Sequence, residues 1–444
     1  MANYDAVIGT DEFALNEFVR TVYDAAHGAL LVGSVPVSLP PLTVTAIDYD
    51  IATAPVVSLQ PSALVERWRE ELLRQVRGRG DDEVTAAAAA ESSASFEMFV
   101  QRVALTVHYA GNQPSTQIEA SVRAGLQLIV VAGGMLTPDI VTLSVEIPDN
   151  PDLAEIVNRG LAPKLMKLIE DNFLAPVQIP PIGLGSLQMS PPIVATGQGR
   201  LLVTTSVLPA QSEAAPLAGA WPDQTVFVAV VPGVLNALFN DALAAADPIT
   251  GYWEKRFDFF FFTITLKAEF KARVSEVAIE PVPGQSGQLR GTARVDVDVH
   301  FWAKNLASFT ATGVARPTVH VTAAVNAANE VTVDLDSIDA ISFDLDFHGV
   351  PGILDNLLET IVNGLAPLIV QAVQGEIAKL PPQAVTKIPQ IPFAFNGTTV
   401  TVTLENVALK TLATPDGKTC LAATGGADVK VSAPTIKHNL TRVG

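Results

Sequence analysis

The sequence predicts an α+β fold made of two tandem domains, because two of its segments occur twice and runs of alternating residues lie between them. Residues 153–171 read LAEIVNRGLAPKLMKLIED, and residues 357–374 read LLETIVNGLAPLIVQAVQ. A second matched pair lies upstream: LNEFVRTVYDAA begins at Leu15, and LNALFNDALAAA begins at Leu235. The two copies of each pair are 205 to 220 positions apart. Duplication of one unit of about 200 residues explains both pairs.

The length of the chain and the composition of one connecting segment suggest where the two units meet. A chain of 444 residues is too long for one ordinary core and suits two domains. Residues 209–222 are rich in Ala, Pro and Ser, which is typical of a connection between domains. We therefore expect a first domain over 1–214 and a second over 215–444. Residues 62–95 have no counterpart in the second half, and we interpret them as a helical insertion.

Alternation of apolar and polar residues predicts strands over 96–147 in the first half, and over 257–281 and 292–348 in the second. In the first half a helix is expected to begin after Asp11, whose side chain suits the N-cap position. The second repeated helix, from about Pro351 to Leu380, carries apolar residues on nearly every side. Such a pattern predicts a helix that is buried all round, in protein or against a lipid.

The composition indicates a folded protein with much apolar surface to cover. The hydrophobic fraction is 48%, the charged fraction 17% and the mean hydropathy +0.33. The longest uncharged apolar stretch, 124–138, is shorter than the ~20 residues that a spanning helix needs. The acidic start, MANYDAVIGTDEF, lacks the basic segment of a signal peptide. We expect a protein that is cytoplasmic, or exported without a cleavable signal peptide, and that hides apolar side chains in deep cores or around a cavity.

The charge and the single cysteine exclude further classes. A net charge of −18 argues against nucleic-acid binding and against docking to anionic headgroups. Cys420 has no second cysteine to pair with, so the chain suits a reducing compartment.

The search for catalytic and metal-binding motifs gives no candidate. The sequence contains no G-x-S-x-G, P-loop, H-E-x-x-H or C-x-x-C pattern, and its six histidines have no ligand spacing. Carboxylate pairs at i, i+2 spacing occur at Asp296 and Asp298, Asp334 and Asp336, and Asp344 and Asp346. They alternate with Val, Leu and Phe, which favours the solvated face of a sheet over a calcium site. We expect no enzymatic activity, no metal and no cofactor.

The order of these elements resembles the tubular lipid-binding (TULIP) superfamily, in the tandem form of bactericidal/permeability-increasing protein. The segment VVPGVLNALFNDAL is similar to the start of the second barrel in that family. GLAP with its apolar helix, followed by KIPQIPFAFNGTTVTVTLENVAL, is similar to its end. The acidic charge and the single cysteine are closer to the bacterial members, including accessory proteins encoded in clostridial neurotoxin clusters. The resemblance implies two elongated domains, each a long α-helix wrapped by a highly curved antiparallel β-sheet.

The resemblance also implies a function: non-enzymatic binding, transport or sequestration of lipids or other long apolar ligands in hydrophobic grooves. The partner would be a lipid or a fatty-acid-like molecule. The lining is expected on the faces of the two repeated helices, at Leu161, Leu165, Leu168, Leu354, Leu357, Leu358, Ile361 and Leu365. The alternative is an interaction scaffold, or a toxin or secretion accessory protein, that keeps the fold but fills its grooves and binds another protein or a second copy of itself.

Overall fold

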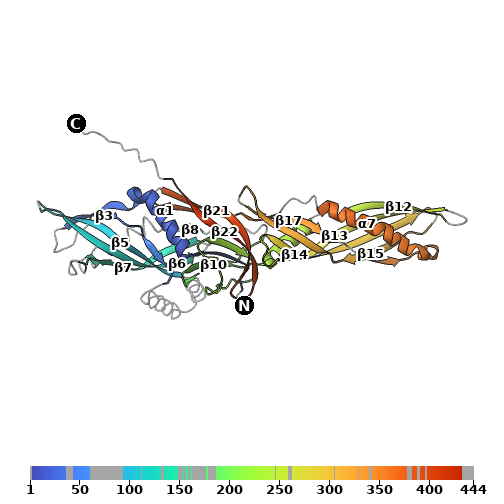
Figure 1. Cartoon of the computed structure of the whole chain (residues 1–444), viewed down its shortest axis with the longest axis horizontal. Helices are drawn as coiled ribbons and strands as arrows, with labels where there is room; N and C mark the ends of the chain where they lie inside the picture. The colour runs from blue at the N-terminus through green and yellow to red at the C-terminus, as the bar shows by residue number, and fades with distance from the viewer. Residues whose placement is uncertain are drawn as a thin grey trace, which may run out of the picture.

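The computed structural model shows an elongated molecule in which three antiparallel sheets follow one another along the long axis (Figure 1). It describes residues 3–432 with gaps at 37–43, 61–93, 112, 132–134, 149–153, 155–156, 159–161, 163–176, 179–186, 246, 259–262, 305, 329, 340–342, 378–382, 388–390 and 396–397. The predicted insertion at 62–95 therefore lies almost wholly outside the described residues.

The first sheet is built from the first half of the chain. Its strands run in the order β2-β3-β5-β6-β7-β8, and β4 pairs with β5. They are β2 (Val32–Pro36), β3 (Val44–Ile51), β4 (Val56–Ser58), β5 (Ala94–Tyr109), β6 (Thr116–Val131), β7 (Met135–Glu146) and β8 (Val177–Gln178). The strands predicted over 96–147 are confirmed as β5, β6 and β7.

The middle sheet takes strands from both halves, in the order β20-β21-β22-β11-β1-β10-β9. These are β1 (Ala6–Asp11), β9 (Ile193–Gly197), β10 (Arg200–Thr205), β11 (Val226–Val230), β20 (Ile391–Phe395), β21 (Thr398–Ala413) and β22 (Thr419–Ser432). At its centre β1 and β11 are antiparallel, with Ile8 opposite Val228. These two residues are 220 positions apart, the same offset that relates Leu15 to Leu235.

The third sheet belongs to the second half and has the order β12-β13-β14-β16-β17-β19, with β15 and β18 pairing beside β14. Its strands are β12 (Ile249–Asp258), β13 (Thr263–Pro281), β14 (Gln288–Ala303), β15 (Phe309–Ala315), β16 (Thr318–Val325), β17 (Glu330–Ile338), β18 (Asp344–His348) and β19 (Gln383–Lys387). Buried and exposed residues alternate along β13, β14 and β15, as the sequence predicted.

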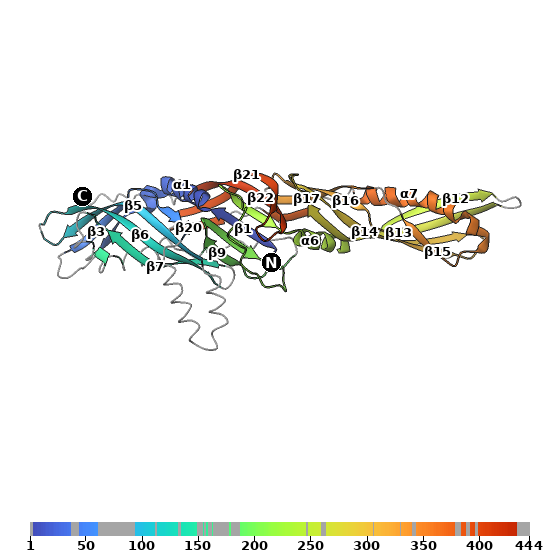
Figure 2. The ribbon, with the colours of Figure 1, turned by 60° about the horizontal axis from the view of Figure 1, so that its bottom comes forward.

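Three α-helices are described in full and pack on these sheets (Figure 2): α1 (Glu12–Leu30), α6 (Pro232–Ala245) and α7 (Leu358–Ile377). A 3-10 turn, η1 (Gly352–Leu357), leads into α7. Asp11 accepts a hydrogen bond from the Ala14 backbone N at 2.8 Å, which confirms it as the N-cap of α1. In the first repeated helix, Ala154, Val157, Asn158 and Ala162 are described, and all four are helical.

The Leu-Asn motif that opens α1 and α6 fastens each helix to a strand. The Asn16 side chain accepts from the Val57 backbone N at 2.7 Å and donates to the Val57 backbone O at 2.8 Å. Its counterpart Asn236 accepts from the Ile279 backbone N at 2.7 Å. Asn16 and Asn236 thus satisfy backbone hydrogen-bonding groups of the strands that have no strand partner. The repeated asparagines therefore have the same structural task.

The largest apolar core runs without interruption from the middle sheet into the third sheet. In the middle sheet the Phe227 ring stacks on Trp221 with 5.5 Å between centroids. Across the ladder, a Cβ on Gly9 would lie 2.2 Å from the Phe227 ring, so only glycine fits at this position. Trp221 itself belongs to the 209–222 connection and is 2% exposed, so this segment is partly packed into the core rather than free in solvent.

Candidate ligand-binding interior

Helix α7 places one apolar stripe inside the second unit. Ile361, Leu365, Ile369 and Val373 recur every four residues, and each is 0% exposed. A four-residue spacing puts these side chains on one face of an α-helix. The opposite face, which includes Asn363 and Pro367, is exposed, and Leu368 there is 38% exposed. Within the protein the helix is therefore buried on one face and not on every side, because apolar composition alone does not say which residues face the sheet.

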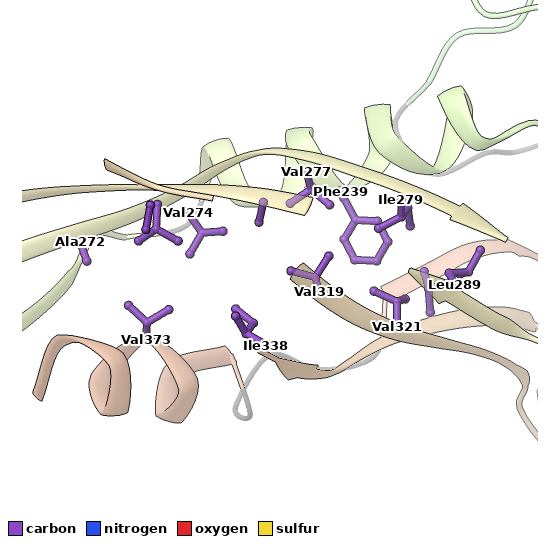
Figure 3. Packing of buried hydrophobic residues seen from close by; sticks show 14 of the residues in the cluster. Phe239, Ala272, Val274, Val277, Ile279, Leu289, Val319, Val321, Ile338 and Val373 are labelled. Atoms are coloured by element: carbon purple, nitrogen blue, oxygen red, sulfur yellow. The ribbon is translucent and has the colours of Figure 1, made fainter. Parts of the chain in front are cut away.

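The sheet encloses that stripe. Helix α7 contacts β12, which is one edge strand, and also β13 and β17. Inward positions on the strands are filled by small and branched residues, such as Ala272 and Val274 on β13 and Val319 on β16. Figure 3 shows Val274, Val319, Ile338 and Val373 pointing toward one another from the strands and from α7. The second unit is thus a tube with a helix closing one side.

Aromatic rings line the part of the tube near β12 and β15. Trp253 is 6% exposed, and a Cβ built on Gly364 of α7 would lie 3.4 Å from its indole ring, so the ring packs closely over the helix backbone. Phe301 stacks on Phe309 with 4.6 Å between centroids, and Phe347 lies 5.9 Å from Phe301. These aromatic residues were not predicted to line the interior, although their alternation with polar neighbours indicates that they face inward.

The tube interior is wholly apolar. Among the residues from 232 to 375 whose side chains the structure describes, no Asp, Glu, Lys, Arg, His, Ser, Thr, Asn or Gln side chain is buried. Burial of a polar group without partners costs free energy, so an interior of this kind accepts only apolar groups. The Asp pairs predicted to face solvent do so in the structure: Asp298, Asp334, Asp336, Asp344 and Asp346 are exposed, and Asp296 pairs with Arg294 at 2.9 Å.

The predicted lining residues fall into three groups. Leu354, Ile361 and Leu365 are 0% exposed and belong to the core of the second unit. Leu357 and Leu358 are half-buried and pack against that core. The remaining three, Leu161, Leu165 and Leu168, lie outside the described residues. Five of the eight positions therefore belong to, or pack against, the core of the second unit.

The first unit has its own apolar interior between β3, β5, β6, β7 and the first repeated helix, with Val100, Leu105 and Val157 among its members. The helix is fastened to β7 by Asn158, which donates to the Val145 O and accepts from the Val145 N, both at 2.7 Å. Its counterpart in α7, Asn363, is exposed. The two repeated helices are therefore attached to their sheets in different ways.

A buried polar row crosses the first sheet. Ser95, Gln127 and Asp139 lie directly opposite one another on β5, β6 and β7. Ser95 and Gln127 are each 2% exposed, and neither Ser95 Oγ nor Gln127 Oε1 has a hydrogen-bond partner. Burial raises the pKa of the Asp139 carboxyl above its ordinary value. Buried polar groups without partners destabilise the sheet locally. The alternation of the sequence did not predict them, because polar residues at these strand positions are expected to face solvent.

Conventional catalytic features are sparse in the described part of the chain. No three His, Cys, Asp or Glu side chains there converge as metal ligands. Cys420 is 1% exposed, and burial raises its pKa to about 12, so the thiol stays protonated. No helix within the described ranges has the length and apolar character needed to cross a membrane.

Comparison with known proteins gives matches in structure only. No protein family and no curated protein sequence matches the chain. Among solved structures, lipopolysaccharide binding protein is 12% identical, with a TM-score of 0.36 and coverage of 96% of this chain and 99% of that one. P47 of Clostridium botulinum E1 is 8% identical, with a TM-score of 0.47 and coverage of 96% and 100%. P47 from Clostridium botulinum A2 is 9% identical, with a TM-score of 0.44 and coverage of 95% and 97%.

Proposed function

We propose that this chain is a non-enzymatic carrier or sequestering protein for lipids or other long apolar molecules, of the tubular lipid-binding kind. The observation that carries the proposal is the interior of the second unit, which is elongated and contains no buried charged, hydroxyl or amide side chain among the residues from 232 to 375 whose side chains the structure describes. An acyl chain needs this environment because it offers no hydrogen-bonding group. Each methylene removed from water contributes ~0.8 kcal/mol, so about twelve of them contribute roughly 10 kcal/mol before the costs of association.

The ligand would enter between α7 and the sheet. The inward stripe of α7 is already in contact with its surroundings, so a guest must displace side chains or separate the helix from β12 and β17. The attachment of α7 suits such a movement: Gln374 Nε2 donates to the Ile338 O over 3.4 Å, a long hydrogen bond. Pro367 inside the helix also removes one backbone donor. Apolar contact, which is not directional, accounts for most of the packing.

The proposal extends to the whole chain. Domains over 1–214 and 215–444 would have arisen by duplication, and the pairing of Ile8 with Val228 at the middle of the chain supports this origin. The second unit is proposed as the main binding unit because its helix lacks the hydrogen bonds that Asn158 makes to the sheet in the first unit. The residues proposed to meet the ligand are Leu354, Ile361 and Leu365, together with the half-buried Leu357 and Leu358.

The experiment is extraction of the purified full-length protein with organic solvent and mass spectrometry of the extract, followed by titration with a fluorescent fatty acid. Leu365→Trp places a larger side chain inside the tube, whereas Leu368→Trp adds the same side chain on the exposed side of the same helix. The proposal expects fatty-acid uptake that Leu365→Trp reduces and Leu368→Trp leaves unchanged. Uptake that neither variant alters, or no lipid and no uptake, would overturn it.

One observation favours a second candidate, an interaction scaffold with a filled interior. Leu354, Ile361 and Leu365 have no exposed surface at all, so the tube is packed by its own side chains at these positions. A protein of this kind would give an empty extract and would not take up the fatty acid, yet would bind another protein or a second copy of itself. The same titration therefore separates the two candidates.

A further inference from the structure

The outer face of the third sheet carries a strip of aromatic rings that the apolar interior does not explain. Tyr252 on β12 and Trp302 on β14 approach to 6.2 Å between ring centroids, and His300 stacks on Trp302 at 5.8 Å. Tyr252 is 51% exposed, His300 is exposed and Trp302 is half-buried. All three lie on the face opposite the buried residues Trp253 and Phe301. We name Tyr252, His300 and Trp302 the aromatic strip.

Two charged residues of β13, the strand between β12 and β14, lie at positions opposite these rings. Lys267 is directly opposite Trp302, and Glu269 is opposite both Tyr252 and His300. Neighbouring positions on this outer face carry charged and hydroxyl side chains, as at Lys271, Asp298 and Thr312. A cluster of partly exposed aromatic rings on such a surface points to a ligand, because Tyr and Trp are typical of surfaces that bury against a partner.

The polar groups beside the strip are largely neutralised among themselves. The Tyr252 hydroxyl donates to Glu254 Oε2 at 2.6 Å, and Lys267 Nζ lies 3.5 Å from the same oxygen. The hydrogen bond from Tyr252 lowers the pKa of Glu254, and the interactions of Lys267 with Tyr252 and Glu254 raise the pKa of Lys267, so the carboxylate and the ammonium both stay charged at neutral pH. Glu269 remains as an acceptor, which disfavours an anionic ligand.

From this arrangement we propose that the aromatic strip binds a neutral saccharide. A pyranose ring has an apolar C–H face, which would pack on the exposed Tyr252 ring with the tilted Trp302 ring beside it, and a rim of hydroxyls. Glu269 can accept from those hydroxyls, Lys267 can donate, and His300 can do either according to its tautomer. A lipid surface fits less well, because Tyr252 is well exposed but Trp302 is half-buried against Tyr252 and His300.

The test is native electrophoresis of the full-length protein in gels that contain dextran, glycogen, mannan or hydroxyethylcellulose. We expect at least one polysaccharide to retard the protein, and Tyr252→Ala to weaken that retardation by about tenfold, the loss of ~1.4 kcal/mol. Glu269→Ala should weaken it as well. Phe13→Ala is the matched control, because Phe13 is an aromatic residue of the first half with 56% exposure. Circular dichroism checks that each variant is folded.

Three outcomes would overturn the assignment: no retardation by any of the four polysaccharides, retardation that Tyr252→Ala leaves unchanged, or an equal effect of Phe13→Ala. Flotation with phosphatidylcholine vesicles serves as the competing assay. Flotation that depends on Tyr252, without retardation by polysaccharide, would assign the strip to a lipid surface and not to a saccharide. The fatty-acid titration is independent of all these results, since Tyr252 lies on the opposite face from the tube interior.

Discussion

The inward stripe of α7 can be tested by comparing two leucines that lie three residues apart. Leu365 is 0% exposed, whereas Leu368 is 38% exposed on the solvent side of the same helix. Leu365→Ala removes the side chain from a packed interior and leaves a cavity, which costs about 2–5 kcal/mol. Leu368→Ala makes the same chemical change at the surface, where substitutions usually alter stability by less than about 1 kcal/mol. Helix propensity contributes equally to both variants and cancels in the comparison.

The assay is urea unfolding of both variants and the parent chain, each carrying Phe at the other three tryptophan positions so that the fluorescence reports Trp253, which packs over Gly364 of α7. We expect the midpoint for Leu365→Ala to fall well below that of the parent, while Leu368→Ala stays close to it. Equal shifts in the two variants would refute the assignment of the buried face. A negligible shift for Leu365→Ala would show that this stripe does not pack against the sheet.

Three further predictions follow from single contacts. Gly291→Ala should destabilise by several kcal/mol, since its Cβ would lie 1.9 Å from the Ala278 O; thermal unfolding checks this. Asn236→Ala should cost about 1–3 kcal/mol in urea, because the Ile279 N loses its acceptor. Burial raises the folded-state pKa of Asp139, so this carboxyl destabilises the fold increasingly as pH rises above its unfolded pKa. Asp139→Asn should therefore stabilise the protein at pH ~7 and not at pH ~3, which thermal unfolding at the two pH values checks.

Much of the strand structure could be predicted because it depends on local pattern. In β13 and β14 the alternation of apolar and polar residues determines which side chains face inward, and the structure follows it over most of both strands, with a break at the bulge between Ser275 and Ala278. Asp11 was identifiable as an N-cap because capping depends only on the next three residues. Helix α7 was located by its repeat, but its buried face was not, since nearly every position is apolar.

The middle sheet and the aromatic strip were beyond sequence reasoning for a different reason. Pairing of β1 with β11 joins Ile8 to Val228, and nothing near either residue identifies the other as its partner. Tyr252 and Trp302 meet across β13 only after three strands are in register. Long-range pairing of this kind is a property of the sheet as a whole. The buried row at Gln127 was missed likewise, because it breaks the expected alternation.

Quenching of Trp253 by a brominated fatty acid tests the central claim most directly. Trp253 faces the interior beside α7, whereas Trp302 lies on the outer face of the same sheet. Two variants would each keep one of these tryptophans and carry Phe at the other three tryptophan positions of the chain. If the tube binds long apolar ligands, the brominated chain quenches Trp253 in a saturable manner and leaves Trp302 bright. Equal quenching of both tryptophans, or none of Trp253, would contradict an interior binding site.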